Sequence, residues 1–183
     1  MSQKVIIAIS SGDAAGVGPE LAIKTALLPE LRQTANLVVT GALNILEEAR
    51  RRYAPEARLI PFPQEATLAT DVVYCDFEES LQLDFSEELV AKASAECGQV
   101  CYDTIVKTTQ AVVDKTFDAI VTAPANKESV NLAGITFQGH TELVAAISGT
   151  EDFAMMQSDG PLRVIFVTAH IPLNEVSSTI TSE

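Results

Sequence analysis

Residues 5–20 read VIIAISSGDAAGVGPE, and they hold the most informative pattern in the chain. The run begins with five apolar residues, which is the length of a buried strand. Glycines at positions 12, 16 and 18 then allow a tight turn, and Pro19 suits the first turn of a helix. A strand that passes through a short glycine turn into a helix is typical of α/β proteins.

Short apolar runs and helical periodicity continue to alternate along the chain. Further strands are expected at residues 37–40, 58–60, 71–75, 118–122, 153–156 and 162–168. Further helices are expected at residues 43–52, 86–115, 126–132 and 141–148. This alternation predicts a mostly parallel sheet with helices on both faces, which is a three-layer α/β/α fold.

Charge and composition exclude several classes of protein. The chain has 183 residues, and its 12 Lys+Arg against 25 Asp+Glu give a net charge of −13. A negative field of this size repels phosphate backbones and anionic lipids, so we expect no nucleic-acid and no membrane partner. Apolar residues make up 47% of the chain, enough for a sizeable core, but no apolar run approaches the roughly 20 residues of a membrane span. We therefore expect a cytoplasmic globular protein.

The three cysteines do not form a disulfide framework, because their number is odd and small. Cys97 and Cys101 could suggest a metal or redox pair, but they lie four residues apart in a helical pattern. With Leu89, Ala93 and Ile105 they form one apolar stripe, so we expect them in the core.

Both histidines of the chain stand where α/β proteins place functional groups. His170 follows an apolar run at 164–169, so we expect it just beyond the carboxyl end of a buried strand. His140 follows Gly139 at the expected start of a helix, where free backbone amides favour an anion. The spacing of thirty residues between the two matches no zinc signature, and two imidazoles do not complete a metal site.

Two other segments could carry chemistry. The glycine turn does not have the GxGxxG spacing of a dinucleotide site, so Asp13 is either a functional carboxylate at the sheet edge or part of a turn chosen for packing. Lys127 follows the strand at 118–122 and could face an anion or solvent equally well.

The last residues, 179–183, read TITSE and have the pattern of a helix start, with hydroxyl residues before an acid. We therefore expect a helix to begin where the chain stops, and the chain to be truncated.

Four segments in order resemble the 4-hydroxythreonine-4-phosphate dehydrogenase family, which includes the pyridoxal phosphate biosynthesis type and its paralogues. They are GDAAGVGPE at 12–20, TAPANKE at 122–128, AGITFQGHTE at 133–142 and TAHIPL at 168–173, and SAECG at 94–98 adds a fifth. The resemblance runs from about residue 5 to the end of the chain and covers the N-terminal portion of a family member. The family usually has proline at position 14 and a bulky aliphatic residue at position 125, where this chain has alanines.

The resemblance implies a fold of the isocitrate and isopropylmalate dehydrogenase type, with an N-terminal α/β domain at 1–130 and the start of a second at 131–183. It implies a homodimer that oxidises a small phosphorylated hydroxy acid of the 4-phosphohydroxy-L-threonine type and then releases carbon dioxide, in pyridoxine biosynthesis. The implied cofactors are NAD or NADP and a divalent metal, which would be Zn, Mg or Co.

The resemblance also implies roles for individual residues. His140 and Thr141 match the substrate-binding pair of the family, and His170 matches the first of its three metal-ligating histidines. The other two ligands would lie beyond residue 183, a fragment of this kind would be inactive alone, and no catalytic residue is assigned.

Other functions stay open at this point. The chain could be a paralogue that acts on threonate or erythronate phosphate or on an aromatic cis-dihydrodiol. It could also be a non-catalytic module that binds a small anion. A metal hydrolase that uses His170 is a weaker alternative, because beyond the two histidines already considered the chain has no further His, and no Cys pair, available as a ligand.

Overall fold

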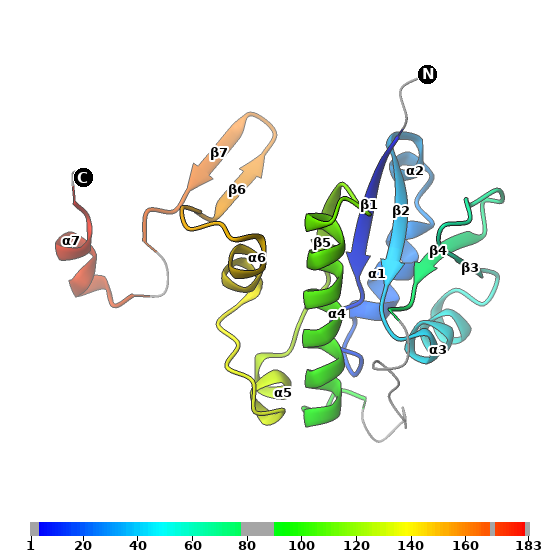
Figure 1. Cartoon of the computed structure of the whole chain (residues 1–183), viewed down its shortest axis with the longest axis horizontal. Helices are drawn as coiled ribbons and strands as arrows, with labels where there is room; N and C mark the ends of the chain where they lie inside the picture. Colours follow the sequence, from blue (N-terminus) through cyan, green and yellow to red (C-terminus); the bar gives the residue numbers. More distant parts are fainter. Residues whose placement is uncertain (1–3, 78–89, 169–170, 182–183) are drawn as a thin grey trace. The chain divides into compact units, whose positions relative to one another are not determined.

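The structure is a computed structural model that describes residues 4–77, 90–168 and 171–181. The chain divides into two compact units, residues 1–148 and residues 149–183 (Figure 1). The first unit contains a five-stranded sheet in the order β3-β4-β2-β1-β5 in which every neighbouring pair is parallel. The predicted α/β fold with a mostly parallel sheet is confirmed.

The elements of the first unit alternate along the chain as expected. Its strands are β1 (Val5–Ser10), β2 (Ala35–Thr40), β3 (Arg58–Pro61), β4 (Asp71–Cys75) and β5 (Ala119–Thr122). Its helices are α1 (Gly18–Ala26), α2 (Pro29–Thr34), α3 (Leu43–Tyr53), α4 (Ala95–Val113), α5 (Lys127–Leu132) and α6 (His140–Ser148). Helix α2 was not expected from the sequence.

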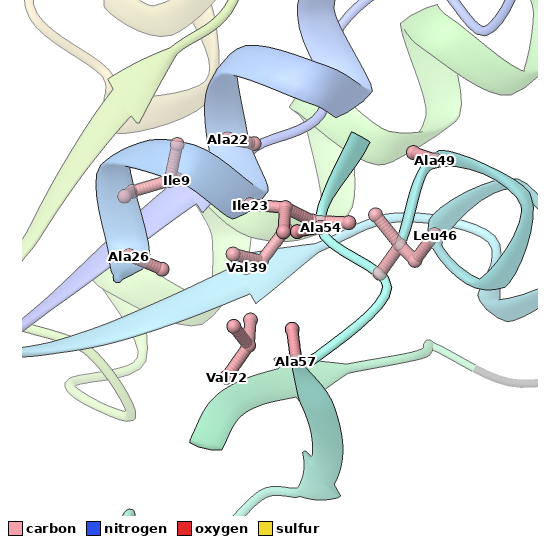
Figure 2. Close-up of a cluster of buried hydrophobic side chains, with 10 residues drawn as sticks. All are labelled: Ile9, Ala22, Ile23, Ala26, Val39, Leu46, Ala49, Ala54, Ala57 and Val72. Atoms are coloured by element: carbon pink, nitrogen blue, oxygen red, sulfur yellow. The ribbon is translucent and has the colours of Figure 1, made fainter. Parts of the chain in front are cut away.

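The two faces of the sheet are covered by different helices. On one face Ile9 and Val39 pack with Ile23 of α1 and Leu46 of α3, and Figure 2 shows this cluster. Successive residues of a strand point to opposite faces, so Ala8 and its register partner Val38 face the other side. There they join Phe117 and the end of α4. The helices therefore enclose the sheet as two outer layers.

Helix α4 begins later than the sequence pattern predicts. The expected helix at 86–115 starts at Ala95 in the structure, and residues 78–89 lie outside the described part of the chain. The Ser94 hydroxyl accepts a hydrogen bond from the Cys97 backbone amide at 3.1 Å, which caps the helix at this position. The core prediction for the cysteines is confirmed, because Cys97 and Cys101 are at most 1% exposed. Of the other predicted members of that stripe, Ala93 precedes the helix and Leu89 lies outside the described residues.

The second unit contains an antiparallel hairpin, formed by β6 (Met156–Asp159) and β7 (Leu162–Ile165), and a short helix α7 (Val176–Thr179) after the turn η2 (Leu173–Glu175). Helix α7 ends at Thr179, and the helix start expected at the end of residues 179–183 stays a prediction, because residues 182 and 183 lie outside the described part of the chain. The hydroxyls of Ser178 and Thr179 both donate to the Glu175 carbonyl oxygen at 2.9 Å, so they complete one helical turn and do not cap a new helix.

Residues 131–148 cluster with the first unit, where α6 packs on α4. The assignment of residues 131–183 to a second domain stays a prediction. Within the described part of the chain, every helix is too short or too polar to cross a membrane.

Candidate functional site

The loops after β1 and β5 meet at the carboxyl edge of the sheet. The Ala123 amide donates to the Ser10 carbonyl oxygen at 3.0 Å, and the Asp13 amide donates to the Pro124 carbonyl oxygen at 2.9 Å. Gly12 makes this contact possible, because it has φ +70° and a Cβ there would overlap the Pro124 carbonyl oxygen. The chain leaves β1 towards β2 on one side and returns as β5 on the other, so this edge is a topological switch point. Open α/β sheets bind their ligands at such points.

Asp13 is buried within the loop after β1. It is 7% exposed, and its Oδ1 accepts one hydrogen bond from the Ala15 amide at 3.2 Å. Burial raises the pKa of this carboxyl above its ordinary value, and the Ala15 amide opposes the shift in part. Burial raises the pKa of the Cys101 thiol to about 12, and the Asp13 charge contributes to this rise. Asp13 therefore faces the interior beside α4.

Lys127 connects the loop after β5 to the start of α6. The Asn126 side chain caps α5 by accepting hydrogen bonds from the Glu128 and Ser129 amides at 2.9 and 3.3 Å. Lys127 is therefore the first residue of this helix. It is exposed, and its Nζ donates to the Gln138 carbonyl oxygen at 2.5 Å. From the sequence, this side chain could face either solvent or an anion. In the structure it contacts Gln138, which precedes His140 by two residues.

His140 begins α6 and is half-buried. Its ring meets the buried Phe137 ring edge to face, with centroids 5.7 Å apart and an interplanar angle of 85°. Burial lowers the pKa of the imidazole below 6.5, and the positive charge of Lys127 lowers it further. The ring is therefore neutral near pH 7. Its Nε2 is buried and has no hydrogen-bond partner within the described ranges.

Thr141 is exposed directly after His140. The first backbone amides of an α-helix have no acceptor inside the helix, and the helix dipole makes this end positive. The start of α6 therefore offers free backbone amides and the Thr141 hydroxyl as hydrogen-bond donors for an anion, and the positive charge of Lys127 acts on the adjacent His140. Sequence reasoning missed the Phe137 contact, although an aromatic residue three positions before a histidine was a visible signal.

The described residues do not form a metal site. No group of three or more His, Cys, Asp or Glu side chains within residues 4–77, 90–168 and 171–181 could hold a metal ion. His170, the predicted metal ligand, lies outside the described residues, so its relation to His140 stays a prediction. The turn after β1 does not form a dinucleotide cradle either, because the place of a Gly12 side chain is filled by the loop after β5.

Comparisons with known proteins agree with each other. The sequence pattern of the family described as pyridoxal phosphate biosynthetic protein PdxA matches residues 32–183. A 4-hydroxythreonine-4-phosphate dehydrogenase of Pseudoalteromonas translucida is 37% identical over 177 residues, which are 97% of this chain and 52% of the relative. A D-threonate 4-phosphate dehydrogenase of Salmonella typhimurium is 35% identical over 179 residues, 96% of this chain and 54% of the relative. The chain spans about half the length of the curated relatives it matches.

Solved structures show the same likeness. The crystal structure of a 4-hydroxythreonine-4-phosphate dehydrogenase from Klebsiella pneumoniae superposes with a TM-score of 0.82 at 30% identity, covering 97% of this chain and 54% of that one. A terephthalate 1,2-cis-dihydrodiol dehydrogenase from Burkholderia xenovorans superposes with a TM-score of 0.65 at 21% identity, covering 96% of this chain and 52% of that one. The second comparison shows a shared fold alone.

Proposed function

We propose a function from the premise that this chain belongs to the PdxA family of pyridoxal phosphate biosynthetic proteins. The protein is a dehydrogenase that oxidises a hydroxyl group of a small phosphorylated hydroxy acid. The observation that carries this proposal is the contact of Lys127, which follows the loop after β5, with the Gln138 carbonyl oxygen just before His140 and the start of α6. Relatives with the same family pattern are named for 4-hydroxythreonine 4-phosphate or D-threonate 4-phosphate.

Both of these substrates are four-carbon acids with a phosphate on the terminal oxygen. They are anions, whereas this chain has a net charge of −13 and repels anions at long range. Binding must therefore come from local donors that act at short distance. The ammonium of Lys127 and the free amides at the start of α6 are donors of this kind.

His140 and Thr141 bind the substrate in this proposal. A neutral imidazole can donate one hydrogen bond to an anionic oxygen and accept another. The Thr141 hydroxyl can donate a further bond, and it is exposed at the first turn of the helix. These groups orient the substrate, and the buried Phe137 ring packs edge to face against the imidazole.

The proposed cofactors are NAD or NADP, which would accept the hydride, and a divalent metal, which would stabilise charge on the oxidised oxygen. The described residues fit neither group, because they form no metal cluster and no dinucleotide cradle. His170 is proposed as a metal ligand from the family resemblance alone. We therefore assign no step of the reaction to either cofactor. A homodimer is likewise part of the proposal.

An activity assay tests the dehydrogenase proposal. The protein is expressed from its complete reading frame and mixed with NAD or NADP and a divalent metal, and the reduced nicotinamide is followed by its absorbance. We expect turnover with 4-hydroxythreonine 4-phosphate or D-threonate 4-phosphate and little with unphosphorylated threonate. The His140→Ala variant should lose most of the turnover. A protein that reduces the nicotinamide with none of the phosphorylated acids, but binds them, would be a binding module and would contradict the proposal.

The same assay decides between the two phosphorylated acids. 4-Hydroxythreonine carries an amino group on the carbon next to its carboxylate, and threonate carries a hydroxyl there. A site that pairs with one of these groups rejects the other, because a buried partner is left without its hydrogen bond. The ratio of kcat/KM for the two acids therefore identifies the preferred substrate.

A further inference from the structure

We propose that Lys127 is a positioning residue for the His140–Thr141 pair, because it ties the turn before α6 to α5 and places its ammonium at the backbone of Gln138 and Gly139, directly before His140. This inference rests on the proposed function and adds a positioning role to the donor role that Lys127 has there. Lys127 acts through His140 and need not contact the reacting atoms.

The first step of the argument is that the backbone of Lys127 is held firmly. Helix α5 lies against α4, and its Ser129 and Val130 are fully buried. The two helices approach closely at Gly98, where any side chain would overlap the Ser129 carbonyl oxygen. The Asn126 side chain caps the N-terminus of α5. The backbone of Lys127 is therefore fixed in position within the first unit.

The second step is the contact across the loop between α5 and α6. The Lys127 Nζ and the Gln138 carbonyl oxygen are 2.5 Å apart and belong to residues separated by 11 positions. A hydrogen bond from an ammonium group is about twice as strong as one between neutral groups. The Gln138 carbonyl precedes Gly139, beside which the Glu142 carboxylate lies. Lys127 therefore fixes the backbone that leads into His140.

The third step is electrostatic. Among the described residues, the titratable groups on the elements near His140 are Lys127 of α5, Glu142 of its own helix, and Cys101 and Tyr102 of α4, which pack in the cluster with Phe137. Among these groups, Lys127 is the one whose charge lowers the pKa of His140 beyond the effect of burial. A neutral imidazole keeps a lone pair free, which a protonated ring does not. The contact and the charge thus act together on the same residue.

Nuclear magnetic resonance of His140 tests the inference without any substrate. The His140 ring signals are identified by their absence in His140→Gln, and their titration with pH is recorded in three variants. Lys127→Met removes the charge and the hydrogen bond, and Lys127→Arg keeps a positive donor. Lys92→Met removes an exposed lysine elsewhere and is the matched control. The KM and kcat of each variant are measured with the phosphorylated acid that the wild type turns over.

We expect Lys127→Met to raise the titration midpoint of His140 and to raise KM about tenfold, which corresponds to roughly 1.4 kcal/mol. Lys127→Arg should restore the midpoint and most of the KM, and Lys92→Met should resemble the wild type. Lys127→Gln, which can still donate to Gln138, serves if the methionine variant does not fold.

A midpoint that is unchanged in both uncharged variants would overturn the inference, whatever the activity. A wild type that turns over no phosphorylated acid would instead overturn the proposed function. In that case the titration still decides whether Lys127 acts on His140, so the two failures are distinguishable.

Discussion

Burial shifts the pKa values of single residues in the candidate site at least as much as their partners do. His140 and Asp13 both sit partly or fully inside the protein, and burial is the main cause of the pKa shift of each. Burial disfavours the charged form of both groups, so it lowers the pKa of the imidazole and raises that of the carboxyl. These shifts have opposite consequences for the pH dependence of stability.

The stability of the fold should decrease on mild acidification because of His140. Its folded pKa lies below 6.5, so the unfolded chain takes up a proton first as the pH falls through that value. The loss continues down to the folded pKa and then stops. Chemical denaturation at a series of pH values measures this loss, and His140→Gln should reduce it. An equally steep loss in the variant would show that other groups cause it.

Asp13→Asn should raise the stability of the protein at pH 7. The folded pKa of Asp13 lies above 3.8, so its stabilising contribution is present at low pH and is lost as the pH rises from 3.8 through the folded pKa. Asparagine keeps the oxygen that accepts from the Ala15 amide and removes the buried charge. Thermal melting should show a gain at pH 7 that shrinks as the pH is lowered. A loss at pH 7 would indicate that the carboxylate has a partner that the described structure does not show.

At the scale of elements, α4 is the platform on which the site is built. Its hydroxyl and thiol side chains face the sheet and the loop after β1, and Thr108 and Thr40 share a buried hydrogen bond of 2.7 Å. Its first turns also carry α5, through the close approach at Gly98, and α6 packs on the same helix. A displacement of α5 would therefore move Lys127 and the site with it.

Gly98→Ala should destabilise the protein by roughly 2–3 kcal/mol, as overpacked buried positions do. Alanine has a higher helix propensity than glycine by about 1 kcal/mol. Whether the substitution raises or lowers the stability therefore depends on the steric overlap. A Cβ at residue 98 would overlap the Ser129 carbonyl oxygen, so the two helices must separate and the steric effect prevails. Denaturant unfolding measures the loss, and Gln99→Ala, at an exposed position of the same helix, is the control. A stabilised Gly98→Ala variant would contradict the close approach of α4 and α5.

At the scale of the whole molecule, the topology of the sheet gathers residues that are far apart in the sequence. The loops after β1 and β5 are separated by more than a hundred positions, yet they share hydrogen bonds because the two strands are neighbours. The second unit differs in kind. Its described residues include no buried one, and its hairpin exposes Leu162 and Ile165 by more than 60%.

Hydrogen exchange should separate the two units of the 183-residue chain. Isolated two-stranded hairpins are marginally stable, so amides of β6 and β7 should exchange much faster than those of β1 and β2, which lie inside the sheet. Exchange followed by mass spectrometry at several protein concentrations measures this difference. Protection of β6 and β7 equal to that of β2 would show that the hairpin is covered in solution.

Much of the fold could be predicted because periodicity is a local property of the sequence. Apolar runs marked β1, β2, β4 and β5, and His140 was correctly expected at the start of a helix. The start of α4 could not be predicted this way. The apolar spacing continues from Cys97 back to Ala93, but the Ser94 hydroxyl caps the N-terminus, so the helix begins only after it. At Ser178 and Thr179 similar hydroxyl side chains close a helical turn that is already formed, and the helix start expected in residues 179–183 stays a prediction because it reaches beyond the described residues.

The sequence by itself determined the parallel α/β fold, the membership of the family and the residues at the start of α6. Only the tertiary structure decided that Lys127 reaches Gln138 and that Asp13 is buried. The reason is physical: a pattern along the chain records which residues are apolar, whereas Coulomb interaction and desolvation depend on distances through space. Those distances arise only when β5 lies beside β1 and both α5 and α6 pack on α4.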